Sequence, residues 1–134
     1  MNKIEHIAFA VGSLSNAIPL FEKLLGTPCY KTETVETEKV KTAFFKTGES
    51  KVELLESLTE DGVIAKFIDK KGEGMHHVAF AVEDIDSEIL RLKAEGFEFI
   101  NEVPKKGADN KLICFLHPKS TNGILIELCQ EIGR

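Results

Sequence analysis

A six-residue segment occurs twice in this chain of 134 residues and constrains the possible folds more than any other feature. The sequence HIAFAV at His6–Val11 returns as HVAFAV at His77–Val82, with an exchange of Ile for Val as the only difference. A polar cluster follows each copy, and after it apolar residues recur at the spacing of an amphipathic helix. Such internal repetition indicates that the chain contains two copies of one supersecondary unit.

The two copies continue with the same predicted elements. A Ser or Asp cap begins each helix, and Gly26 or Gly96 ends it. Pro19 fits best in a first turn, so we expect the first helix to begin near Ser15 or to be kinked. Beyond each glycine the period changes to two, which predicts three strands in each half. These strands are expected at Cys29–Val35, Lys39–Thr47 and Lys51–Ser57, and at Glu98–Val103, Lys111–His117 and Gly123–Cys129.

The predicted fold class is therefore α+β, built from two tandem βαβββ modules within a single domain. Module one covers about residues 1–58 and module two about residues 73–134, with a connector at about 59–72. Apolar residues in the connector, such as Phe67 and Ile68, indicate that it is no loose linker. A short helix within Glu60–Lys71, packed on the body of the domain, is expected there.

Composition narrows the classes of function. The net charge of −5 argues against generic binding of nucleic acid, because phosphate backbones favour basic surfaces. No segment approaches the length of apolar sequence that spans a membrane, and the N-terminus lacks the apolar stretch of a signal peptide. Cys29, Cys114 and Cys129 are odd in number and have no CxxC spacing, which predicts reduced thiols in a cytoplasmic protein.

Four polar residues interrupt predicted strands at matched positions of the two halves. His6 and His77 begin the first strands, while Glu53 in KVELL and Glu127 in ILIEL lie in the last strands. A pseudo-twofold axis would bring two imidazoles and two carboxylates to one point, and this donor set suits a divalent ion such as Co²⁺, Mn²⁺, Ni²⁺ or Zn²⁺. His76 precedes His77 and by alternation points to the opposite face.

These residues and the segments around them resemble the vicinal-oxygen-chelate superfamily and, within it, the methylmalonyl-CoA epimerase family. The resemblance covers nearly the whole chain, and its most specific segments are GMHH at Gly74–His77, FLHPKS at Phe115–Ser120 and GILIEL at Gly123–Leu128. It implies a glyoxalase-like fold, in which the paired modules form a curved mixed sheet around a metal site, and a homodimer. It also implies one divalent ion per chain, Co²⁺ first, ligated by His6, Glu53, His77 and Glu127.

The implied reaction interconverts the C2 epimers of a 2-methylmalonyl thioester through an enolate, which a divalent ion stabilises as a Lewis acid. Two bases on opposite faces of C2 are needed. Glu127 is the first candidate and Glu53 the second, and Glu36 and Glu38 follow. One branch of the family has a base glutamate at the position where this chain has Thr42, which leaves that role without its usual residue.

The coenzyme A portion of such a substrate needs cations for its phosphates and hydrogen-bond donors for its acyl group. Ser120 and Gly123, in the turn before the Glu127 strand, are candidates to bind the substrate carboxylate. Lys106 and Lys119 are candidates for substrate binding, within a wider set of lysines that comprises Lys39, Lys41, Lys105, Lys106, Lys111 and Lys119.

Three other functions compete with the epimerase. A glyoxalase I-type lactoylglutathione lyase uses the same ligands and enolate chemistry on a different thiol adduct. A metal-free binding module of the superfamily is the second alternative, although such modules lose ligands that this chain keeps. A ring-cleaving dioxygenase needs a site of two His and one carboxylate that is open to oxygen, for which four protein ligands leave less room.

Overall fold

The structure is a computed structural model that describes residues 1–133, and the chain divides into two compact units. The N-terminal unit is His6–His76, and the C-terminal unit combines Met1–Glu5 with the chain from His77 onward. Each unit follows the βαβββ order of elements, so the α+β class and the two βαβββ modules are confirmed, although one strand of the second repeat lies elsewhere than predicted.

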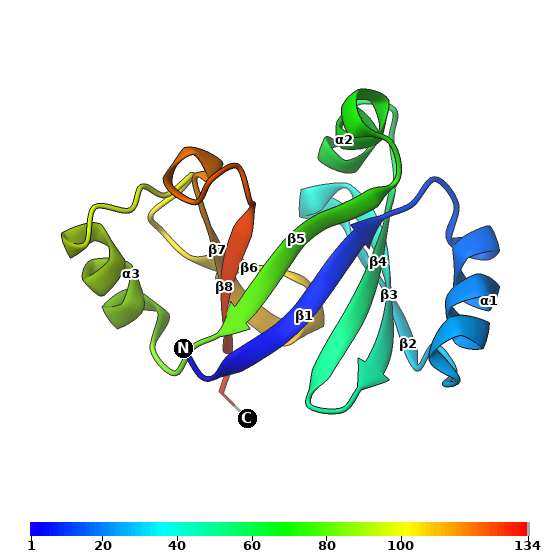
Figure 1. Cartoon of the computed structure of the whole chain (residues 1–134), viewed down its shortest axis with the longest axis horizontal. Coiled ribbons are helices and arrows are strands. Elements are labelled where there is room, and N and C mark those ends of the chain that lie inside the picture. The colour runs from blue at the N-terminus through cyan, green and yellow to red at the C-terminus, as the bar shows by residue number, and fades with distance from the viewer. Residues whose placement is uncertain (134) are drawn as a thin grey trace. The chain divides into compact units, whose positions relative to one another are not determined.

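The N-terminal unit contains a four-stranded mixed sheet in the order β2-β3-β4-β1, shown in blue to green in Figure 1. Strand β1 runs parallel to β4, and the other neighbours are antiparallel. The elements are β1 (Lys3–Ala10), α1 (Leu14–Leu25), β2 (Lys31–Val35), β3 (Val40–Thr47), β4 (Ser50–Ser57) and α2 (Val63–Lys71). Helix α2 is the short helix predicted in the connector.

Helix α1 has the predicted caps at both ends. Ser13 Oγ accepts the Asn16 N–H at 3.3 Å, and Gly26 adopts a φ of 69°, which an L side chain rarely tolerates. The helix begins at Leu14, close to the predicted start at Ser15, and runs on through Pro19. Because Pro19 lies on the exposed side of the helix, the carbonyl that lacks its N–H partner faces solvent.

Both faces of the N-terminal sheet are covered by apolar side chains from a helix. Strand residues alternate between the faces, so one set packs against α1 and the other against α2. The α1 side is built on Leu14, Ala17, Ala43, Phe45 and Leu54. The α2 side is built on Ala8, Ala10, Val40, Leu55 and Ile64. The second of these faces also carries His6 and Glu53, so it is the one that matters for the site.

The C-terminal unit repeats this arrangement in the strand order β5-β8-β7-β6. Its helix packs on one face of the sheet through Ile85, Ile89 and Leu92. The elements are β5 (Gly74–Ala81), α3 (Ile85–Ala94), β6 (Lys105–Lys106), β7 (Lys111–Leu116) and β8 (Ile126–Glu131). The first residues of β5, up to His76, belong to the N-terminal unit.

The predicted strand at Glu98–Val103 is wrong. Only Phe99 in that segment forms a bridge, with Leu116, and the edge strand β6 lies further along at Lys105–Lys106. Phe99 packs into the α3 core, and backbone hydrogen bonds from Ile100 N–H to the Phe115 carbonyl and from His117 N–H to the Glu98 carbonyl join the segment to β7 without a regular ladder. Strand β8 starts at Ile126, later than predicted, because Asn122 and Gly123 have positive φ angles of 57° and 84° that form a turn.

Two further sequence expectations concern the cysteines and the membrane. Cys114 and Cys129 are buried and Cys29 is partly buried, and none of the three forms a disulfide. Within residues 1–133, the helices are too short or too polar for any of them to cross a membrane.

Candidate functional site

In the N-terminal unit, His6 and Glu53 come together from neighbouring strands. Ala8 of β1 pairs with Glu53 of β4, and His6 lies two residues before Ala8 on the same face of the sheet. His6 Nε2 lies 3.2 Å from Glu53 Oε1. Both residues are buried, with exposed fractions of 7% and 4%. The imidazole and the carboxylate are therefore held in contact away from bulk water.

The C-terminal unit contains the same pair at the same register. Ala79 of β5 pairs with Glu127 of β8, and His77 Nε2 lies 2.8 Å from Glu127 Oε1. The ring of Phe115, which pairs with Glu127 across β7 and β8, meets the His77 ring edge-on with a centroid distance of 5.5 Å. Packing on this aromatic ring restricts the orientation of the imidazole.

The donor chemistry of each pair fits a divalent metal ion. A neutral imidazole supplies a nitrogen ligand, and an ionised carboxylate supplies an oxygen ligand, the combination that Co²⁺, Mn²⁺, Ni²⁺ and Zn²⁺ accept. A buried carboxylate also needs a cation or hydrogen-bond donors to offset the cost of its burial. Each unit thus places one nitrogen donor and one oxygen donor at equivalent positions of its sheet.

His76 and Thr42 occupy nearby positions without such donor geometry. The His76 ring packs edge-on against Phe67 of α2 at a centroid distance of 4.9 Å. Thr42 is fully buried, and its hydroxyl donates to the backbone carbonyl of Glu33 at 3.3 Å. A threonine held in this way presents no carboxylate, so position 42 offers no base.

A buried thiol lies near the carboxylate of the C-terminal pair. Burial, together with the smaller effect of the negative charges of Glu127 and Asp86, raises the pKa of Cys114 to about 12. Cys114 is therefore protonated at neutral pH and is a poor nucleophile or metal ligand in this state.

The turn before β8 places three of the predicted substrate-binding residues close together. Ser120 Oγ accepts the Glu98 N–H at 2.9 Å, which leaves its own hydroxyl hydrogen available as a donor. The Gly123 N–H donates to the Pro118 carbonyl at 2.8 Å. Lys119 Nζ lies 3.0 Å from Glu98 Oε1, and its side chain is mostly exposed. Of these three residues, Ser120 and Lys119 carry side-chain groups that can bind a ligand.

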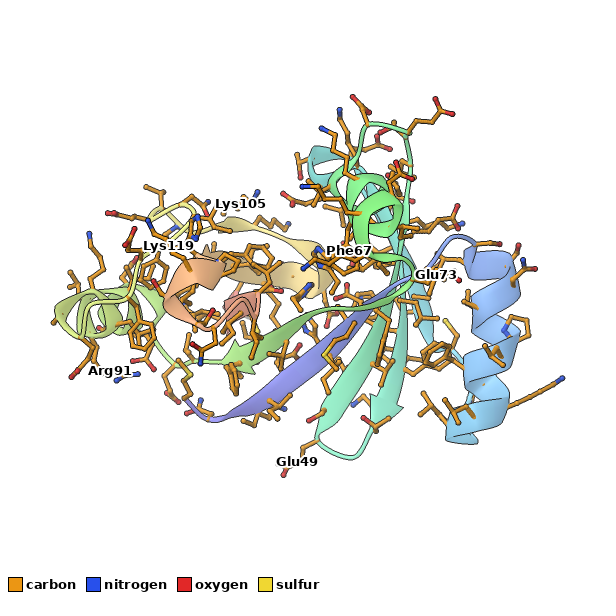
Figure 2. All side chains as sticks on the ribbon, turned by 45° about the horizontal axis from the view of Figure 1, so that its top comes forward. Glu49, Phe67, Glu73, Arg91, Lys105 and Lys119 are labelled. Atoms are coloured by element: carbon orange, nitrogen blue, oxygen red, sulfur yellow. The ribbon has the colours of Figure 1, made fainter. Side chains whose placement is uncertain are left out.

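The other lysines differ in how accessible they are. Lys105 and Lys106 are exposed on β6, and Figure 2 labels Lys105 and Lys119. Lys39 forms an exposed ion pair with Asp61 at 3.2 Å. Lys111, in contrast, is buried and faces the carboxylate of Glu5, so its inclusion among the phosphate-binding candidates is wrong.

The N-terminal unit also has an open pocket of about 470 Å³ that sequence reasoning missed. Side chains of β1 and α1, among them Phe9, Leu20 and Phe21, form its wall. At its rim the Glu73 carboxylate, labelled in Figure 2, accepts the Gly12 N–H at 2.7 Å. This hydrogen bond uses one oxygen of the only acid in the lining, and the other lining residues are apolar or carry uncharged polar groups.

Comparison with protein families identifies the sequence pattern independently of the structure. Residues 5–115 match the model of the Glyoxalase/Bleomycin resistance protein/Dioxygenase superfamily. Human mitochondrial methylmalonyl-CoA epimerase is 34% identical over 131 residues, which cover 97% of this chain and 74% of that protein. The uncharacterized protein YqjC of Bacillus subtilis is 41% identical over 133 residues, covering 99% of this chain and 95% of that one.

Solved structures give the same result. Methylmalonyl-CoA epimerase from Mycobacterium tuberculosis matches with a TM-score of 0.93 and 32% identity, over 98% of this chain and 89% of that one. A methylmalonyl-CoA epimerase in complex with methylmalonyl-CoA and NH₄⁺ matches with a TM-score of 0.91 and 30% identity, over 99% and 96% of the two chains.

Proposed function

This chain belongs to the glyoxalase, bleomycin resistance protein and dioxygenase superfamily and to its methylmalonyl-CoA epimerases, and we propose that it interconverts the C2 epimers of methylmalonyl-CoA. The proposed reaction is a 1,1-proton transfer that passes through an enolate. The substrate is thus an acyl-CoA thioester.

The observation that carries this proposal is the equivalence of the two His–Glu pairs. Each pair is buried, and each is formed across the same register of its unit, at Ala8 with Glu53 and at Ala79 with Glu127. One pair alone provides only two protein ligands, which is few for a tightly held ion. We therefore infer that both pairs, His6 with Glu53 and His77 with Glu127, hold a single divalent ion. Co²⁺ is the expected ion, with Mn²⁺, Ni²⁺ and Zn²⁺ as alternatives.

When bound, such an ion supplies Lewis acidity to the thioester oxygen, on which the negative charge of an enolate develops. The residues of the chain must then move the proton. One carboxylate accepts the C2 proton while the C–H electron pair becomes part of the C1–C2 double bond, and a carboxylic acid on the opposite face returns a proton to C2. We assign Glu127 to one face, and Glu53 is the first alternative for the other.

Substrate positioning is assigned to the turn before β8 and to exposed lysines. Ser120 donates its hydroxyl hydrogen to the free carboxylate of the substrate, and Gly123 shapes the turn through its positive φ of 84°. Lys106 and Lys119 offer ammonium groups to the coenzyme A phosphates. We further propose that the chain forms a homodimer, which light scattering of the purified protein tests directly.

The test of the function is an assay of 2-methylmalonyl-CoA in D₂O with and without a chelator. The protein is expected to epimerise each epimer and to incorporate deuterium at C2, to lose both activities with the chelator, and to regain them with Co²⁺. Glu49→Gln, in the turn between β3 and β4, serves as a control of unchanged activity. Failure of the metal-loaded protein to exchange the C2 proton contradicts the proposal. Conversion of a glutathione hemithioacetal instead supports a glyoxalase-type lyase.

A further inference from the structure

The sheet face that carries the His6–Glu53 pair has a second carboxylate, on the edge strand β2. Glu33 pairs with Thr42 of β3, Thr42 pairs with Leu55 of β4, and Leu55 is two residues from Glu53. Residues paired across neighbouring strands point to the same face, and so do residues two apart along one strand. Glu33 and Glu53 therefore share this face.

No other acidic side chain of β1 to β4 lies on the same face. Its positions are Ile4, His6, Ala8 and Ala10 of β1, Lys51, Glu53, Leu55 and Ser57 of β4, Val40, Thr42, Phe44 and Lys46 of β3, and Lys31, Glu33 and Val35 of β2. Glu53 is already in contact with the His6 imidazole at 3.2 Å. Glu33 is thus the one carboxylate on this face that the proposed metal site does not use as a ligand.

Lys31 connects Glu33 to Phe44, the residue that pairs with Glu53. Glu33 Oε1 lies 3.6 Å from Lys31 Nζ, and Lys31 Nζ lies 5.0 Å from the centroid of the Phe44 ring. Phe44 is buried and pairs directly with Glu53. Lys31 therefore positions the Glu33 carboxylate toward the Phe44 ring. With one third of its side chain exposed, Glu33 also remains accessible to a ligand and to solvent protons.

The C-terminal unit does not duplicate this carboxylate. In that unit Cys129 lies two residues after Glu127 and pairs with Ile113, and Ile113 pairs with Lys105 of the edge strand β6. Lys105, labelled in Figure 2, thus occupies the position that corresponds to Glu33. The two repeats differ in charge at this position, so an acid and base role there belongs to the N-terminal unit alone.

We propose that Glu33 is the catalytic base on one face of C2 and that Lys31 is its positioning residue; this inference rests on the proposed epimerase function. The Glu33 carboxylate removes the C2 proton of one epimer, and the C–H electron pair enters the enolate. A proton from the carboxylic acid of Glu127 then adds to C2 on the other face. For the opposite epimer, Glu127 removes the proton and protonated Glu33 returns one, so protons balance in both directions.

The test compares Glu33→Gln with Glu127→Gln in D₂O, starting from each C2 epimer separately. We expect Glu33→Gln to slow epimerisation by about 10²-fold or more. It is expected to lose deuterium exchange from one epimer and to keep exchange from the other. Glu127→Gln is expected to show the opposite pattern. Lys31→Met is expected to slow exchange from the Glu33-dependent epimer only, since it removes the ammonium while keeping most of the side-chain length.

A measurement of metal binding and a control variant keep the outcomes separate. The amount of bound Co²⁺ and its visible spectrum should be the same in Glu33→Gln as in the parent. A variant that had lost the metal site would differ in both. Glu49→Gln, at the hairpin tip labelled in Figure 2, should behave as the parent in every assay. Epimerisation by Glu33→Gln within about threefold of the parent, or loss of exchange from the same epimer in both variants, overturns the assignment. A metal-loaded parent without C2 exchange would instead show that the epimerase function itself is wrong, and the assignment falls with it.

Discussion

His77 Nε2 lies 2.8 Å from Glu127 Oε1, and this contact reproduces in the second repeat the contact that His6 makes with Glu53 in the first. Both are set by one register, in which the residue two positions after the histidine pairs with the glutamate. Equal positions in the two repeats lead us to expect equal contributions to metal binding.

The first prediction is that His6→Ala and His77→Ala each weaken Co²⁺ binding by roughly a hundredfold or more. Mutation of a residue that only hydrogen-bonds to a metal ligand already lowers metal affinity by about ten- to a hundredfold, and loss of a ligand should lower it at least as much. His76→Ala should bind Co²⁺ as the parent does, since its ring packs on Phe67. Titration of the metal-free proteins, followed by the visible spectrum, measures all three. If only His76→Ala lost binding, the ligand would lie on the other face of β5.

The duplicated pairs were predictable from sequence because repetition and strand alternation fix which face a residue occupies. HIAFAV and HVAFAV align the histidines, and VEL and IEL align the glutamates, so the register followed without coordinates. Glu33 was not predictable in this way. Its relation to Glu53 depends on the pairing of β2 with β3, and its counterpart Lys105 lies on β6, whose position sequence reasoning misplaced.

The misplaced edge strand has a physical cause. The segment Glu98–Val103 contains the strand-forming residues Phe99, Ile100 and Val103, but Phe99 uses its side chain to pack on the α3 core. Pro104 lacks an N–H and so cannot donate to a ladder at the point where the chain leaves this segment. Pairing resumes only at Lys105, opposite Ile113. Tertiary packing and Pro104 thus decide where the edge strand lies, whereas the local residue types predict it at Glu98–Val103.

The second prediction separates the two proposed roles of Glu127. Glu127→Gln keeps an oxygen donor of similar shape but removes the basic carboxylate, so the variant should retain Co²⁺ and lose epimerisation by about 10²-fold or more. Glu127→Ala should lose both properties. Metal content and epimerisation rate, measured on the same preparation, provide the test. A Gln variant with full metal content and the parent rate would limit Glu127 to metal binding.

The third prediction concerns the reactivity of Cys114, which burial shields and whose pKa lies at about 12. At pH 8 only about one thiol in 10⁴ is then a thiolate, so iodoacetamide should leave Cys114 unmodified in the folded protein. Modification at Cys29, which is only partly buried, should come first. Mass spectrometry of peptides from native and urea-unfolded protein locates the label. Rapid labelling of Cys114 in the native state would contradict the burial.

The raised pKa of Cys114 also predicts how the unfolding free energy changes at high pH. The pKa of Cys114 is raised from 9.0 to about 12 on folding, so the folded state holds its proton more tightly. The contribution of this shift to the unfolding free energy is complete below pH 9 and is lost as the pH rises toward 12, because the unfolded chain releases the thiol proton first. Comparison of the parent with Cys114→Ala should show that the parent loses more of its unfolding free energy over this range.

The last prediction concerns the buried Lys111, whose Nζ lies 3.9 Å from carboxylate oxygens of Glu5, Asp109 and Glu131. Lys111→Met removes the cation and leaves Glu5, only 4% exposed, beside other acids, which should lower the unfolding free energy by about 3 kcal/mol. Adding Glu5→Gln to that variant should recover part of the loss, because it removes the buried negative charge that Lys111 no longer offsets.

Lys41→Met is the matched control, since Lys41 is exposed on β3, and it should change the unfolding free energy by less than about 0.5 kcal/mol. Urea denaturation of the four proteins gives the values. If Lys111→Met were as stable as Lys41→Met, or if Glu5→Gln deepened its loss, Lys111 would not be offsetting the buried charge of Glu5. The ion pair would then be a consequence of how the start of β7 packs, with no stabilising role of its own.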